Sequence, residues 1–225
     1  MKVAAEDGGA VARAESLVRL FHQSPASFAA LTAVSADAVP QPYRGLLDHR
    51  SHMTAAMERH HGGPVSLRVV AHDGPRTEAD GREWYAREIL LSNEAGDVVQ
   101  YGIVRIDLSS LGTADAARVR NATAPLGRIL MAAGVLCDVR DVSLVAVHPG
   151  DELRRLIGDR ATFGRVALIR VDGSPAIELL EIVVDSRGGY SVGACGRSGD
   201  RGFSRLSRSS RNPSWDNDLW LVGRY

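Results

Sequence analysis

Cysteine and aromatic residues are scarce in this chain. It has two cysteines in 225 residues, Cys137 and Cys195, and aromatic residues make up 5%. The cysteines lie far apart and form no CxxC or other metal-binding spacing, so neither a disulfide framework nor a zinc site is predicted. We therefore expect a mainly aliphatic core and free thiols in a reducing compartment.

An excess of charge of either sign is also absent. Lys+Arg and Asp+Glu both number 27, a formal net charge of +0, which argues against nucleic acid as the main partner. No stretch approaches the roughly 18–20 apolar residues that a membrane-spanning helix needs. Residues 1–9 contain no apolar core of a signal peptide. These absences predict a cytoplasmic protein that has no nucleic-acid or membrane partner.

What the chain does contain is the pattern of one α+β domain. Its length and its 44% hydrophobic content suit a single substantial core. Helical spacing of apolar residues predicts helices at 10–22, around 28–34, at 52–61 and at 126–133. Alternating patterns predict strands at 65–72, 84–93, 98–108, 142–147, 166–171 and 177–185. Short turns at 94–97 and 172–174 make two hairpins, so we expect an antiparallel sheet with helices gathered on one side.

Two charged residues interrupt apolar strand faces. Arg87 shares a face with Tyr85, Ile89 and Leu91 at a period of two residues. Burying a guanidinium requires an anionic partner, and the planar fork of arginine suits a carboxylate. The pattern leaves open whether that partner is a bound acid or an internal carboxylate.

Glu181 poses the corresponding question for a carboxylate. It lies on a strand face with Ile177, Leu179 and Val183. Desolvation would favour its protonated form and make it a candidate proton donor, unless it simply pairs with Arg87 across the sheet. Glu178 falls on the other face and is predicted to be a solvated edge charge.

No motif for metal or nucleotide chemistry is present. His49, His52, His60 and His61 cluster in sequence, but their spacing fits no zinc signature and favours a solvated helix end. The chain contains no GxSxG, P-loop or GxGxxG motif. Cys137 has no His-Asp partner pattern and is predicted to be a buried thiol.

Several short segments, in their order along the chain, resemble the chorismate lyase family, and its actinobacterial branch in particular. The segments include REILL within the strand around Arg87, PLGR at the start of the helix at 126–133, and the Met-Thr pair that opens the helix at 52–61. Further matches are Leu46-Leu47, Glu58, Gly102, Phe163-Gly164-Arg165, Gly173-x-Pro175 and Leu180-Glu181. Together they span roughly residues 43–185, and no single one of them is specific.

This resemblance implies a six-stranded antiparallel sheet with a ligand enclosed under two helix-turn flaps. It implies that Arg87 binds a substrate carboxylate, that Glu181 is the acidic residue of the last strand, and that Met53 and Leu126 contact the ligand through their backbones. Between Pro175 and Glu181 this chain has one residue more than the enterobacterial pattern. Glu178 is therefore the alternative to Glu181 as the acidic residue of the last strand.

The implied activity is elimination of pyruvate from chorismate to give 4-hydroxybenzoate, or 3-hydroxybenzoate, for secondary metabolism. Arg87 would hold the substrate anion and Glu181 would protonate the enolpyruvyl ether. No metal or organic cofactor is implied, and family members are often monomers.

Two other functions stay open. The chain could act on another anionic ring acid or a polyketide-like acid, or it could be a non-catalytic small-molecule-binding module of the kind found in transcription regulators. The expected organisation is a helical lead-in at 1–42, a chorismate lyase-like catalytic domain at 43–185 and an Arg/Ser/Gly-rich tail at 186–225. The composition of the tail is typical of disorder, although its aromatic end could pack back on the domain.

Overall fold

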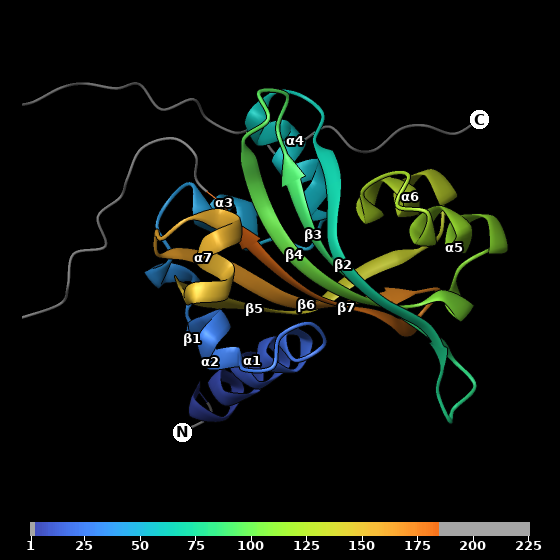
Figure 1. The fold of residues 1–225 in the computed structure, drawn as a ribbon, viewed down its shortest axis with the longest axis horizontal. Coiled ribbons are helices and arrows are strands. Elements are labelled where there is room, and N and C mark those ends of the chain that lie inside the picture. Colours follow the sequence, from blue (N-terminus) through green and yellow to red (C-terminus); the bar gives the residue numbers. More distant parts are fainter. Residues whose placement is uncertain (1–2, 185–225) are drawn as a thin grey trace, which may run out of the picture. The chain divides into compact units, whose positions relative to one another are not determined.

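The computed structural model describes residues 3–184, with side chains from residue 8 onward. Its centre is a seven-stranded sheet in the order β1-β5-β6-β7-β4-β3-β2 (Figure 1). The strands are β1 (Ala29–Val34), β2 (Ser66–Thr77), β3 (Glu83–Ser92), β4 (Val98–Asp107), β5 (Cys137–Pro149), β6 (Thr162–Val171) and β7 (Ser174–Val183). Every neighbouring pair is antiparallel, so the predicted α+β class with an antiparallel sheet is confirmed.

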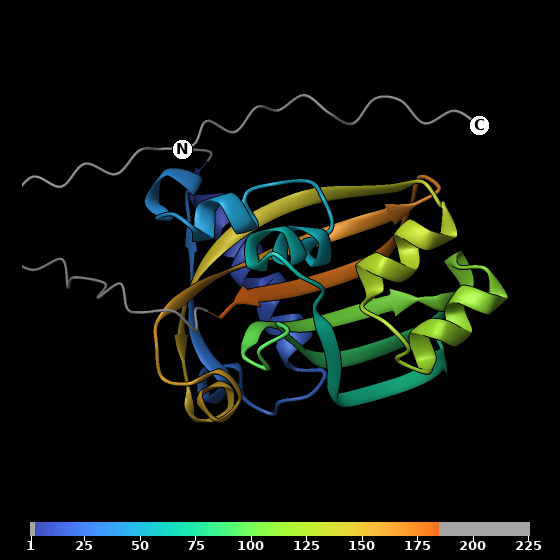
Figure 2. The ribbon, with the colours of Figure 1, turned by 90° about the horizontal axis from the view of Figure 1, so that it is seen from above.

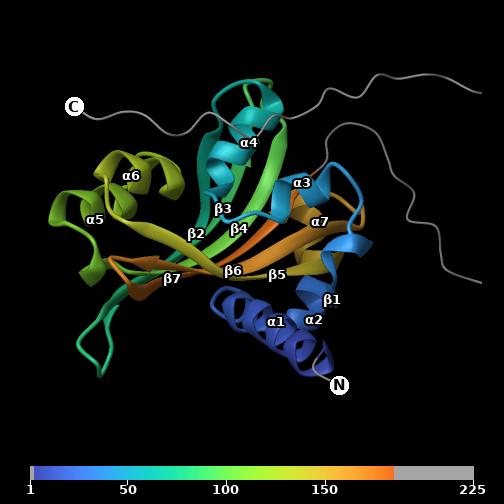
Figure 3. The same cartoon turned by 180° about the vertical axis from the view of Figure 1, so that it is seen from behind.

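Helices cover both faces of this sheet. They are α1 (Val3–Val18), α2 (Pro25–Phe28), α3 (Tyr43–Leu47), α4 (Met53–His61), α5 (Thr113–Arg120), α6 (Leu126–Ala133) and α7 (Asp151–Ile157), with short 3-10 turns at Ala36–Ala38 and Leu108–Ser110. Figures 1 and 3 show α1 against one face and α3 to α6 over the other. The expectation of helices on one side is thus wrong, because α1, α2 and α7 bury their own core with the second face.

The two predicted hairpins are confirmed, and their turns explain them. Gly96 (φ 86°) lies in the turn between β3 and β4, while Asp172 (φ 48°) and Gly173 (φ 83°) form the two-residue turn between β6 and β7. Two consecutive residues with positive φ match the twist of a tight hairpin.

Local signals also set the ends of α4 and α6. Gly62 (φ 73°) and Gly134 (φ 66°) end the two helices in the left-handed region, and Pro125 directly precedes α6. Glycine adopts that conformation without steric penalty, which is why both helices end where the sequence predicts. Figure 2, seen from above, shows α4, α5 and α6 in front of the sheet.

The sheet has seven strands, not the six expected, because residues 29–34 form β1. That segment was predicted to be helical, but only Pro25–Phe28 is helix and the following residues pair with β5. Ala29, Leu31 and Ala33 are less exposed than the residues between them. A short apolar run fits both the period of a helix and the two-residue period of a strand, and pairing with β5 decides between them.

Residues of the predicted tail lie outside the described residues. None of the helices in the described part of the chain is long and apolar enough to cross a membrane.

Candidate ligand-binding site

A small cavity of about 40 Å³ lies between the sheet and the helices α4 and α6. Three of the four predicted site residues line it: Met53 from α4, Leu126 from α6 and Glu181 from β7. Much of the remaining lining is apolar and comes from Ile89, Leu91, Val104, Leu130, Val139, Ile169 and Leu179. The structure therefore brings together residues that are more than 120 positions apart in the sequence.

Arg87, the fourth predicted residue, lies on the same sheet face but does not line the cavity. Its partner in the sheet is Val104 of β4, which lines the cavity, so Arg87 lies just beyond one end of the cavity. Its side chain is 0% exposed. Nη1 donates to the carbonyl of Val119 at 3.1 Å, whereas Nε and Nη2 have no partner among the described residues.

The surroundings of Arg87 are unfavourable for a cation. Burial lowers the pKa of its guanidinium, and the nearby Tyr85 hydroxyl only partly opposes this. The contact with Val119 lies in the last turn of α5, where exposed carbonyls offer some stabilisation. Within the described residues no carboxylate lies within ion-pair distance, so the internal pair with Glu181 left open by the sequence is not formed.

Glu181 pairs with Arg165 instead. Arg165 Nε donates to Glu181 Oε2 at 2.7 Å, and the Arg165 side chain is 1% exposed. Arg165 also donates to the carbonyls of His49, at 2.9 Å, and Ser51, at 3.3 Å, in the loop before α4. This arginine belongs to the Phe-Gly-Arg segment of the resemblance, but nothing in its strand pattern predicted its role.

Glu178 lies on the opposite face of the sheet, as its strand position predicted. It pairs with Arg105 at 3.2 Å and its side chain is 47% exposed. Glu181, not Glu178, is thus the acidic residue that reaches the cavity.

The loop before α4 also brings two histidines close to this ion pair. Burial lowers the pKa of both His49 and His52, while the nearby charges of Arg165, which lowers it, and Glu181, which raises it, oppose each other. A neutral imidazole is favoured there, and no group of His, Cys, Asp and Glu in the described part of the chain could hold a metal ion.

The two helices over the cavity are joined tightly. Arg128 of α6 forms an ion pair with Glu58 of α4. Gly127 permits close approach, because a Cβ there would lie 2.9 Å from Thr54 Oγ1. Two residues of the Pro-Leu-Gly-Arg segment therefore serve the packing of α6 on α4.

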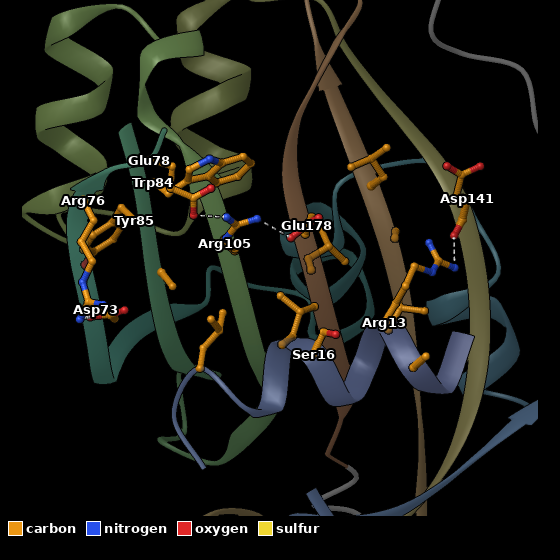
Figure 4. Close-up of a pocket in the computed structure, with 18 residues that line it drawn as sticks. Arg13, Ser16, Asp73, Arg76, Glu78, Trp84, Tyr85, Arg105, Asp141 and Glu178 are labelled. Carbon is orange, nitrogen blue, oxygen red and sulfur yellow. Dashed lines mark hydrogen bonds and ion pairs between the residues drawn. The ribbon is translucent and has the colours of Figure 1, made fainter. Parts of the chain in front are cut away.

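A larger groove of about 690 Å³ lies on the opposite face of the sheet, beside α1 (Figure 4). None of the four predicted site residues lines it. Arg105 stacks 3.8 Å from the centre of the Trp84 ring and pairs with Glu78 and Glu178. These charges satisfy one another, although the buried Nε1 of Trp84 has no hydrogen-bond partner among the described residues. We take the small cavity beside Arg87 as the candidate site because it gathers three of the four predicted residues.

Solved structures resemble this fold, although no protein-family profile and no curated protein matches the chain. The effector domain of PhnF from Mycobacterium smegmatis is 13% identical over 61% of this chain and 90% of its own, with a TM-score of 0.45. The ligand-binding domain of a GntR-family transcriptional regulator from Bordetella bronchiseptica is 16% identical over 54% and 86%, with a TM-score of 0.41. The C-terminal domain of the histidine utilization repressor from Pseudomonas syringae is 11% identical over 60% and 99%, with a TM-score of 0.42.

These comparisons do not bear out the expected family and activity. The similar solved structures are domains of transcriptional regulators, and none of those named is a lyase. The expectation of a lyase that releases pyruvate and a hydroxybenzoate is corrected by this finding, which does not test the assignment of Arg87 and Glu181 as site residues. The segments that carried the resemblance include packing features, such as the one at Gly127, which do not specify a reaction.

The expectation that nucleic acid plays no part is corrected by the same finding, because these proteins are transcriptional regulators.

Proposed function

We propose that this chain is a non-catalytic domain that binds a small organic anion between the sheet and the helices α4 and α6. The observation that carries the proposal is Arg87, a fully buried guanidinium with two nitrogens that have no partner among the described residues. A buried charge without a counter-charge is strongly unfavourable. An acidic ligand that reaches Arg87 would remove that penalty.

The cavity supplies the rest of such a site. Apolar side chains from the sheet form its floor, and Met53 and Leu126 close it from the two helices. This combination of an apolar enclosure and a few directed polar groups is typical of small-molecule sites. At about 40 Å³ the cavity is small, so we propose that α4 and α6 separate to admit the ligand.

A binding role needs no proton transfer from Glu181. Its carboxylate is engaged by Arg165, and this pair holds the loop before α4 against the sheet. We propose that the cytoplasm is the setting, since a free thiol such as Cys137 stays reduced there. The role parallels the description of the Bordetella protein as a ligand-binding domain.

The test is calorimetric titration of the protein with small carboxylates: acetate, butanoate, hexanoate and benzoate. We expect at least one of them to bind and to raise the melting temperature. Arg87→Met should abolish that binding, and Arg87→Lys should weaken it because an ammonium group cannot grip a carboxylate at two points.

The matched control is Arg68→Met, which removes an exposed arginine from β2 of the same sheet and should leave binding intact. If no carboxylate binds, or if Arg87→Met binds as well as the unmodified protein, the proposed function is wrong.

A further inference from the structure

A second buried polar group faces the cavity without a partner. Gln100 of β4 lines the cavity and is 2% exposed. Its Nε2 donates to Glu181 Oε1 at 3.4 Å, but its Oε1 has no hydrogen-bond partner among the described residues. A buried amide oxygen that is left unpaired is unfavourable, so this group calls for an explanation.

The orientation of the amide follows from its neighbour. Glu181 is a carboxylate paired with Arg165, and a carboxylate can only accept hydrogen bonds. If the amide were turned over, its oxygen would face another oxygen. The nitrogen therefore faces Glu181, and the acceptor is left for a donor from the cavity.

Gln100 and Arg87 mark opposite ends of one row on the sheet. Gln100, Gly102 and Val104 follow one another along β4 and all line the cavity, and Arg87 is the partner of Val104 on β3. At the usual rise per residue, the Cα atoms of Gln100 and Val104 are about 13 Å apart. Gly102 leaves the middle of the row without a side chain, with Ile89 and Leu179 on the neighbouring strands.

We infer that Gln100 is a specificity-determining residue, and that its side-chain oxygen accepts a hydrogen bond from an O–H or N–H group at the end of the ligand remote from Arg87. This inference rests on the proposed binding function. The ligand class it names is an elongated small organic acid with an anionic group at one end, a hydrogen-bond donor at the other and an apolar middle.

The carboxylate of Glu181, next to Gln100, already has two donors. Glu181 accepts from Arg165 and from Gln100 itself. Arg165, by contrast, is a donor only, so it cannot accept a hydrogen bond from an O–H or N–H group. Because the oxygen of Gln100 is buried and has no partner among the described residues, we expect it to distinguish a ligand with a terminal donor from one of the same shape without it.

The experiment compares 5-hydroxypentanoate with hexanoate, which places a methyl group where the first acid has its hydroxyl. Both are titrated calorimetrically into the unmodified protein, Gln100→Met, Gln100→Asn and the control Gln23→Met, whose glutamine is exposed. We expect the unmodified protein and the control to prefer the hydroxy acid by roughly tenfold, as befits a buried acceptor that one ligand satisfies and the other does not. Gln100→Met should lose the preference, and Gln100→Asn should reduce it because the shorter side chain withdraws the oxygen.

The outcomes separate the inference from the proposal on which it rests. If both acids bind equally well and Arg87→Met abolishes their binding, the anion site stands and the role of Gln100 is wrong. If both Gln100 variants still prefer the hydroxy acid, the role of Gln100 is also wrong. If neither acid binds the unmodified protein, the inference is wrong. If none of the small carboxylates named above binds either, the proposed function is wrong as well.

Discussion

Arg165 and Glu181 face each other directly in the register between β6 and β7, and their side chains form an ion pair at 2.7 Å. The arginine is 1% exposed and the glutamate side chain 14%. The same guanidinium holds two carbonyls of the loop before α4. One buried pair thus joins the floor of the cavity to the helix that covers it.

Removing the carboxylate of this pair should destabilise the fold. In Glu181→Gln the Arg165 guanidinium stays buried without its counter-charge, and we expect a loss of about 3 kcal/mol in the free energy of unfolding. Urea denaturation measures it. Glu178→Gln is the control, because that carboxylate is half exposed and should contribute under about 1 kcal/mol. Equal losses in the two variants would show that the buried pair has no special role.

Removing the buried charge of Arg87 should have the opposite effect. Without ligand, Arg87→Met should raise the free energy of unfolding by about 1–2 kcal/mol, because methionine fills similar space without a charge to desolvate. The carbonyl of Val119 keeps a partner, since it also accepts from the backbone N–H of Ala122 at 3.2 Å. A clear destabilisation in urea denaturation would mean that Arg87 supports the fold itself.

Two glycine substitutions should change stability in opposite directions. Gly127→Ala should lower the free energy of unfolding by about 1 kcal/mol, because its Cβ would lie 2.9 Å from Thr54 Oγ1 and 3.1 Å from His52 Cβ. Gly9→Ala in α1 meets nothing within 4 Å and should raise stability by about 0.5–1 kcal/mol through helix propensity. Thermal unfolding of both variants checks the pair, and a neutral Gly127→Ala would refute the close approach of α6 to α4.

His22 should make stability fall as the pH rises from 6.5 through its raised pKa. Its ring contacts Glu88 of β3 at 3.1 Å and also Glu152 of α7, while the Tyr101 hydroxyl donates to Glu88 at 2.7 Å. The Glu88 hydrogen bond, opposed in part by desolvation, raises the pKa of His22 above its ordinary value of 6.5. The folded state then binds more protons than the unfolded state between pH 6.5 and the raised pKa, so this contribution is complete below pH 6.5 and is lost above that window.

His22→Gln isolates this effect. Unfolding free energies of both proteins across the window should converge as the pH rises. His49 and His52 have lowered pKa values and act with the opposite sign below pH 6.5, outside the window. A constant difference between the two proteins would mean that the charge of His22 contributes nothing.

The sequence by itself determined the elements whose signals are local. The turns at Gly96 and Gly173 and the helix ends at Gly62 and Gly134 depend on backbone conformations that glycine adopts easily, so they could be read from neighbouring residues. Period-two spacing likewise placed Arg87 and Glu181 on apolar faces. Nothing so local could identify β1, whose short apolar run became a strand only through pairing with β5.

Tertiary structure alone decided which partner each buried charge received. Arg87 and Glu181 share a face, yet Glu181 pairs with Arg165 on the adjacent strand while Arg87 lies two strands away. Gln100 gave no sequence signal, because its unpaired oxygen is a consequence of where Glu181 lies. The order and register of the strands bring these buried polar groups together across the sheet. The spacing of residues along one strand carries no information about strand order or register.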